Sequence, residues 1–152
     1  MSRVLWLAMA GCLLGAGCFQ DSTAQHSAFL PLSNYQATFQ VVRDCRLNIQ
    51  HSNQYQLVYA NTIAAEPYTN GVYPLPAGSV VFAEEHDNDS SCTSLTGYYL
   101  MAKERPGYDS AAHDWHWQEL DDNQRVLKDG HLTTCSSCHA QPPCNDFLCS
   151  PP

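Results

Sequence analysis

Residues 135–139, Cys-Ser-Ser-Cys-His, combine two thiols and an imidazole at a spacing that suits three kinds of chemistry. Cys135 and Cys138 could form a redox dithiol, supply half of a zinc site, or each bond to one vinyl group of a porphyrin. In the third case the next residue, His139, is carried under the iron and becomes its proximal ligand. The sequence around the motif separates these alternatives.

Haem attachment explains the motif best. A thioredoxin-type dithiol follows an early strand of an α/β unit, whereas this motif follows a series of predicted strands. Four thiolates for zinc are available, but the two pairs are cramped together; they are Cys135, Cys138, Cys144 and Cys149. Only haem attachment accounts for the adjacent His139. The sequence therefore predicts one covalent haem c whose iron is bound by His139.

The first residues predict export, which agrees with a c-type haem because this haem is attached outside the cytoplasm. Arg3 precedes a short apolar run and then small residues, which is typical of a signal peptide. Gly15-Ala16-Gly17-Cys18 resembles a bacterial lipobox, so we expect Cys18 to carry lipid. The alternative is simple cleavage near Ala24 with a soluble periplasmic product. The expected division is a signal peptide at 1–17, a tether at 18–32 and a haem domain at 33–152.

The net charge argues against one class of function, and the number of cysteines limits the possible disulfides. A formal net charge of −8 without a basic stripe disfavours nucleic-acid binding. Once Cys12 leaves with the signal peptide, Cys18 carries lipid and two thiols bind haem, four of the eight cysteines remain. They allow three disulfide connectivities, of which we favour Cys45–Cys92 and Cys144–Cys149. The second would clip the short, proline-rich tail.

The pattern of apolar residues predicts an α+β fold, mainly an antiparallel β-sheet with flanking helices. We expect a short helix over 53–66, followed by a Pro/Gly-rich connection. Strands are expected at 79–86, 96–104 and 114–120, the last followed by a polar turn. Their aromatic residues suit a half-buried pleated surface.

The order of these segments resembles the cytochrome P-460 family and its relatives, the β-sheet cytochromes c′. The resemblance rests on "VYAN", "YPLPAGSVVFAEE", "GYYLMAKE", "DWHWQEL" and the terminal "CSSCH", and it covers roughly 55–140. It implies a cytochrome P-460-like monohaem c-type domain with Cys135 and Cys138 as thioether cysteines and His139 as proximal ligand. In cytochromes P-460 a lysine also bonds to the porphyrin, but the matching position here is Ala83. The chain is therefore more similar to the uncrosslinked relatives, which bind nitric oxide and carbon monoxide.

This resemblance implies an open iron site that binds nitric oxide or a similar small ligand. The alternatives are a hydroxylamine or nitric oxide oxidoreductase of the cytochrome P-460 type and a periplasmic electron-transfer cytochrome. The expected partners are a small diatomic or nitrogen-oxide ligand, a periplasmic redox partner and, through the lipid anchor, a membrane facing the periplasm of a Gram-negative bacterium. A homodimer is compatible with these features. The sequence leaves the physiological ligand and the distal residue open.

Several side chains are candidates for the surroundings of the haem. Apolar and aromatic residues from the strands could cap it, such as Phe82, Tyr98, Leu100 or Trp117. Glu84, Glu85, Glu104 and His86 have the chemistry of a proton acceptor. For Glu84 and Glu85, however, we favour a solvated strand end. His86 could instead be a distal ligand, Lys103 is expected to be a solvated strand residue, and His131 could lie near a haem propionate. The other histidines, His26, His51, His113 and His116, carry no sign of a role.

Overall fold

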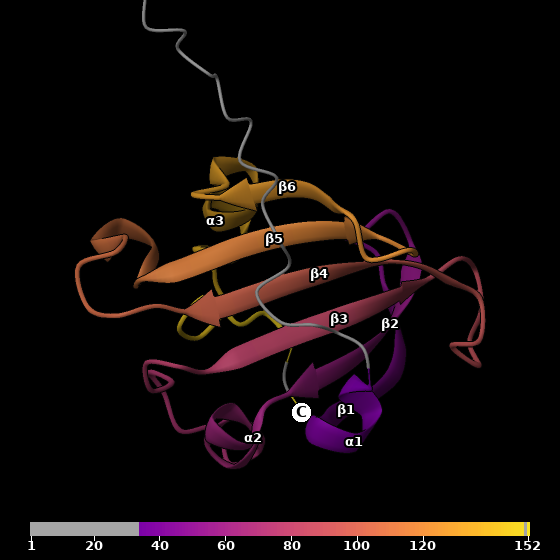
Figure 1. The fold of residues 1–152 in the computed structure, drawn as a ribbon, viewed down its shortest axis with the longest axis horizontal. Coiled ribbons are helices and arrows are strands. Elements are labelled where there is room, and N and C mark those ends of the chain that lie inside the picture. Colours follow the sequence, from indigo (N-terminus) through magenta and orange to yellow (C-terminus); the bar gives the residue numbers. More distant parts are fainter. Residues whose placement is uncertain (1–33, 151) are drawn as a thin grey trace, which may run out of the picture.

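One six-stranded antiparallel sheet forms the framework of the protein, which we describe from a computed structural model. The structure describes residues 34–150 and 152, and its strands lie across the sheet in chain order (Figure 1). The strands are β1 Gln40–Asn48, β2 Gln54–Ala60, β3 Val80–His86, β4 Leu95–Lys103, β5 Trp115–Asp121 and β6 Val126–Gly130. The helices are α1 Tyr35–Thr38, α2 Thr62–Thr69, the 3-10 turn η1 Ser110–Ala112 and α3 Thr133–His139. The predicted α+β fold is confirmed.

The three predicted strands correspond to β3, β4 and β5, while the helix predicted over 53–66 is wrong in its first half. That half is β2, which pairs with both β1 and β3. The helix starts only after Asn61, whose side-chain oxygen accepts a hydrogen bond from the Ala64 amide at 3.1 Å. Hydrogen bonding on both sides and burial of alternate side chains outweigh the local helical tendency of β2.

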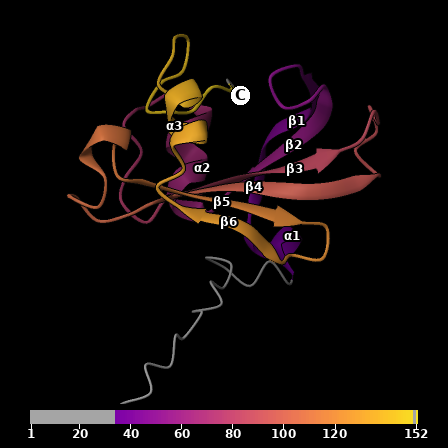
Figure 2. The same cartoon turned by 90° about the horizontal axis from the view of Figure 1, so that it is seen from above.

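The face of the sheet that carries α2 and α3 is here called the cavity face. A row of successive cross-strand partners runs across it, the central row, made of Val58, Ala83, Tyr99, Glu119 and Lys128. Figure 2 shows α2 and α3 above this face, and the hairpin of β1 and β2 curving up on the same side. The central row therefore lies at the bottom of a space bounded by α3 and by that hairpin.

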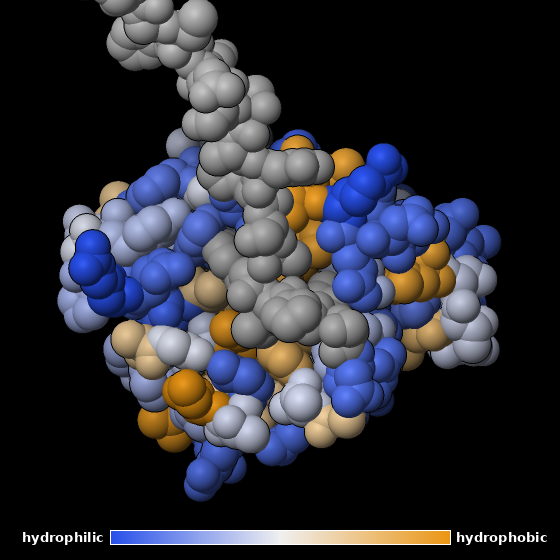
Figure 3. All heavy atoms as spheres, in the orientation of Figure 1, coloured by the Kyte–Doolittle hydropathy of each residue, from blue (hydrophilic) through white to orange (hydrophobic). Residues whose placement is uncertain are grey.

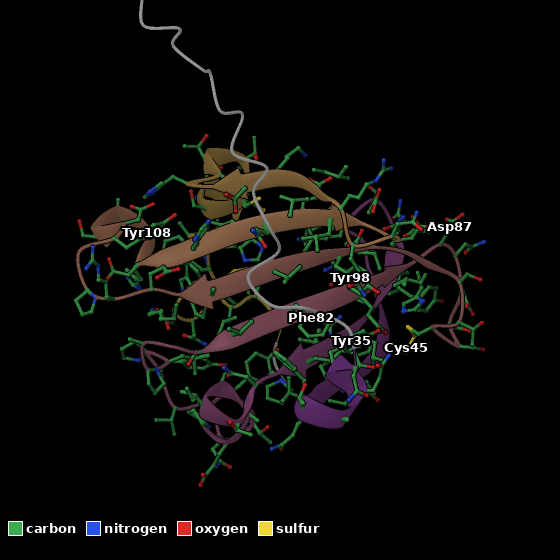
Figure 4. All side chains as sticks on the ribbon, viewed as in Figure 1. Tyr35, Cys45, Phe82, Asp87, Tyr98 and Tyr108 are labelled. Atoms are coloured by element: carbon green, nitrogen blue, oxygen red, sulfur yellow. A yellow bond between two sulfur atoms is a disulfide. The ribbon has the colours of Figure 1, made fainter. Side chains whose placement is uncertain are left out.

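The opposite face carries a separate aromatic core, which corrects part of the predicted haem surroundings. Phe82, Tyr98 and Leu100 pack there with Tyr35 of α1, and Figure 4 labels three of these residues close together. Side chains alternate along a strand, so these three point away from the cavity face. Figure 3 views this opposite face, where most visible residues are hydrophilic and the apolar ones form small separate groups. Of the four predicted capping residues, only Trp117 lies on the cavity face.

Both favoured disulfides are present. Cys45–Cys92 ties β1 to the loop between β3 and β4, and Cys144–Cys149 closes a loop after α3. Within the described residues no helix is long and apolar enough to span a membrane. The predicted signal peptide, Cys18 and the tether lie outside the described residues.

Candidate haem site

Helix α3 holds the Cys-Ser-Ser-Cys-His motif beside a cavity of about 710 Å³. The lining includes residues of all six strands, the β1–β2 turn and the tail after α3, and it contains Cys135, Cys138 and His139. Its volume lies within the range of roughly 300–1,000 Å³ that is usual for ligand and cofactor sites. The three residues predicted from the motif are therefore brought together beside a hollow large enough for a cofactor.

His139 is held in one orientation by contacts on two sides. Its Nδ1 lies 2.7 Å from the carbonyl oxygen of Phe147, and this contact assigns the ring proton to Nδ1. The Trp117 ring packs edge-on at 4.9 Å between ring centres. Burial lowers the pKa of His139 below its ordinary value. The ring is therefore neutral at pH 7, and its Nε2 lone pair is available to a metal ion.

The tail supplies the carbonyl that orients His139 and is itself anchored to the sheet. Cys144–Cys149 encloses Phe147 in a short loop. Asp146, in the same loop, accepts hydrogen bonds from Lys103 Nζ at 2.6 Å and from the Leu75 amide at 2.8 Å. These contacts fix the loop against β4, so the predicted disulfide contributes to the position of the proximal histidine.

The two motif cysteines fit neither a redox dithiol nor a zinc site. Both thiols are free, and burial raises the pKa of Cys135. A reactive redox thiol needs a lowered pKa. Zinc would need further thiolates, but Cys144 and Cys149 bond to each other, and the described residues contain no cluster of three metal-binding side chains.

Two buried hydrogen-bond donors in the cavity lining lack acceptors among the described residues. They are the guanidinium of Arg43, through Nε and Nη2, and the indole Nε1 of Trp117. Arg43 is 8% exposed and follows a register shift in β1 that pairs it with Val58, a member of the central row. A buried cation without a partner is costly. A cofactor with carboxylate groups, such as haem with its propionates, would satisfy it.

Residues 33–150 match the protein family Cytochrome P460. The chain belongs to the cytochrome P460 family. A search of curated proteins found no matching relative. Membership in this family supports a c-type haem with iron as the cofactor, and the free thiols, the oriented imidazole and the unpartnered Arg43 of this chain fit such a group.

The family resemblance placed the crosslinking lysine at Ala83, and in this member of the cytochrome P460 family Ala83 lies on the central row. Its side chain therefore points into the cavity that α3 borders. Lys103 is not the solvated strand residue that the sequence predicted. Its side chain is 9% exposed and forms an ion pair with Asp146, whose side chain is 2% exposed. Withdrawing it would remove the lysine cation that pairs with the buried Asp146 carboxylate, at a cost of about 3–5 kcal/mol.

The acidic end of β3 is buried, contrary to the predicted solvated strand end. Glu84, Glu85 and His86 are each no more than 6% exposed. Because side chains alternate along the strand, Glu84 and His86 point to the opposite face and Glu85 to the cavity face. Glu84 and His86 contact each other at 3.2 Å beside the aromatic core, where Tyr35 also donates a hydrogen bond to Glu84. His86 is therefore on the wrong side of the sheet to be a distal ligand. Burial against the β4 and α1 residues explains why these polar groups are paired rather than solvated.

Two other predicted residues lie away from the cavity of this cytochrome P460 fold. Glu104 lies 3.4 Å from His116, and His131 pairs with Asp109 at 2.9 Å and stacks on Tyr108. Neither Glu104 nor His131 lines the cavity.

Sequence reasoning missed His51, which lies in the cavity lining and faces His139. The sequence contains one sign of this position, namely a histidine within a polar turn. That sign points to the cavity only when β1 and β2 are known to form a hairpin.

Proposed function

We propose that the protein is an exported, lipid-anchored monohaem c-type cytochrome that binds nitric oxide or a similar small ligand at its iron. Cys135 and Cys138 would hold the porphyrin through two thioethers, and His139 would bind the iron from the proximal side. The unpartnered guanidinium of Arg43 would pair with a propionate. The haem supplies a metal site for a small gas molecule. Nitric oxide binds well to ferrous iron, so a periplasmic redox partner is needed to deliver an electron.

The absence of a methionine opposite His139 carries the proposal. Met101 is the only methionine among the described residues, and it is the cross-strand partner of Trp117, which packs on His139. Met101 therefore lies on the proximal side and is badly placed to bind the iron from the other side. An electron-transfer cytochrome with histidine–methionine ligation is thus disfavoured, and the sixth position suits an exchangeable ligand.

Nitric oxide added to the reduced protein should shift the Soret band to a new position with clear isosbestic points. The reason is that a small ligand entering the sixth position changes the field at the iron. The measurement is an anaerobic spectral titration, carried to completion. As a control, protein with Cys135→Ala and Cys138→Ala should show no such band. The same titration is made with His51→Ala, because His51 also lines the cavity. If excess nitric oxide leaves the spectra of both the wild type and this variant unchanged, the proposed function is refuted.

The anchor is tested separately, because it concerns residues outside the described part of the chain. Gly15-Ala16-Gly17-Cys18 supports acylation at Cys18. Full-length protein should fractionate with membranes and incorporate labelled fatty acid, whereas Cys18→Ser should lose both properties. Cys12→Ser is the matched control and should behave as the wild type. A wild-type protein found in the soluble fraction would contradict the anchor and leave the haem proposal untouched.

A further inference from the structure

His51 lies at the tip of the β1–β2 hairpin and faces the proximal histidine across the cavity. The ring centres of His51 and His139 are 6.2 Å apart, and their planes are at 75°. Both residues line the same cavity. The β1–β2 turn is fixed by backbone hydrogen bonds on both sides of His51, from its own amide to Asn48 O and from the Gln54 amide to His51 O.

The separation of the two rings equals what one metal ion between them requires. Histidine–metal bonds are about 2 Å long, and the ring centre lies about 1 Å behind the bonding nitrogen, so two imidazoles on opposite sides of one ion have centres about 6 Å apart. The cavity between α3 and the hairpin therefore has a histidine at each side of the expected iron position.

Each imidazole is prepared for metal binding by a hydrogen bond at its other nitrogen. His139 uses Nδ1 toward Phe147 O at 2.7 Å, and His51 uses Nδ1 toward Glu85 Oε1 at 3.1 Å. A metal-binding histidine characteristically donates its second N–H to a carbonyl or carboxylate, which sets the tautomer and the ring orientation. Nε2 is thus the ring nitrogen that remains for a metal ion on both rings.

Glu85 is positioned for this role by its own partners. Gln56 Nε2 donates to Glu85 Oε1 at 2.7 Å, and Asn48 Nδ2 donates to Gln56 Oε1 at 2.6 Å. Glu85 is 5% exposed and Gln56 is 2% exposed, so the chain of hydrogen bonds is buried beneath the hairpin. It sets the position of the Glu85 carboxylate to which His51 bonds.

The sheet register places the two histidines on different sides of the central row. Trp117, which contacts His139, lies two residues along its strand from Glu119 of the central row. Glu85, which holds His51, lies two residues from Ala83 in the opposite direction across the sheet. Tyr99 of the central row packs edge-on against His51 at 4.9 Å. A planar group standing over the central row would have His139 against one surface and His51 against the other.

We propose that His51 is the sixth ligand of the haem iron in the resting protein, and that a small ligand binds by displacing it. This inference rests on the proposed function, because it describes how the same iron is closed and opened. The His51 ring is 25% exposed and is held by a turn and one hydrogen bond to Glu85, so the imidazole can withdraw without disturbing the sheet. In the exchange, the bond between His51 Nε2 and the iron would break first, and the incoming ligand would then take the vacated position.

The spin state of the ferric protein tests the ligand assignment. Visible and electron paramagnetic resonance spectra should show six-coordinate low-spin iron in the wild type and mainly high-spin iron in His51→Ala. Added imidazole should return the variant to low spin. His131→Ala is the matched control, since His131 is 53% exposed and does not line the cavity, and it should keep the wild-type spectra. High-spin wild-type iron, or low-spin iron unchanged by His51→Ala, would overturn the assignment.

Carbon monoxide binding to the reduced protein tests the displacement. The observed rate in the wild type should level off as carbon monoxide increases, at the rate with which His51 leaves, whereas His51→Ala should remain linear. If about one iron in a hundred is open at rest, His51→Ala should also bind about 100-fold more tightly. Linear kinetics and equal affinity in the two proteins would refute gating by His51, while normal nitric oxide binding would still uphold the proposed function.

Discussion

Replacing Cys135 and Cys138 together with alanine should abolish covalent haem. Each thiol forms one thioether, and these are the only free cysteines among the described residues. In a host that matures c-type cytochromes, the wild type should give a haem-stained band on a denaturing gel, and the double variant should give none. Loss of this band is the largest effect that we expect from any change in the chain, because His139 alone holds haem only by coordination.

The matched control removes two other cysteines from the same end of the protein. Cys144→Ala with Cys149→Ala should keep the stained band, since that pair forms a disulfide and takes no part in thioether bonding. It should, however, loosen the loop that presents the Phe147 carbonyl to His139. A stained band in the Cys135→Ala/Cys138→Ala protein, or haem lost from the wild type on denaturation, would disprove attachment at this motif.

Hydroxylamine should be turned over negligibly if Ala83 stands at the position of the family's crosslinking lysine, as the sequence resemblance implies. A methyl group cannot bond to the porphyrin, so the macrocycle would keep ordinary conjugation and two covalent links. A haem peptide prepared by proteolysis should have the mass expected for two thioethers and no third bond. Oxidation of hydroxylamine with an added electron acceptor should remain at the background rate of a non-enzymatic control.

Ala83→Lys is the complementary experiment. Ala83 faces the cavity from the central row, so a lysine there reaches the space that the porphyrin would occupy. We expect a third covalent bond under oxidising conditions, seen as a changed peptide mass and a red-shifted Soret band. Val41→Lys is a suitable control, because Val41 is 54% exposed and is not part of the cavity lining. A third link in the unmodified protein, through Lys103 or Lys128, would show that the assignment of Ala83 is wrong.

Much of the fold could be predicted from local pattern. Strands β3, β4 and β5 are rich in aromatic or β-branched residues and are bounded by turn residues, so their positions were predicted correctly. β2 could not be recognised, because its helical or extended state depends on pairing with β1 and β3. β1 and β6 contain charged residues and lie at the edges of the sheet, where only one neighbour selects the extended form.

The haem ligands and the distal residues differ in how far they could be predicted. Cys135, Cys138 and His139 form a contiguous motif whose spacing suits haem attachment, so the sequence by itself predicted the covalent cofactor and the proximal histidine. Cysteine parity and the short tail likewise favoured the two disulfides that the structure contains. These features depend on residues that are adjacent in sequence or on simple counting.

Only the tertiary structure indicated which of the remaining histidines we propose as an iron ligand. His86 and Glu85 are neighbours in β3, yet strand alternation sends His86 to the opposite face, while Glu85 supports His51 on the cavity face. The position of His51 depends on the register of β1 with β2 and on the curvature of their hairpin. His51 and His139 are far apart in the chain, and no local pattern links them; the folded sheet brings their rings to 6.2 Å because the hairpin and α3 border the same cavity.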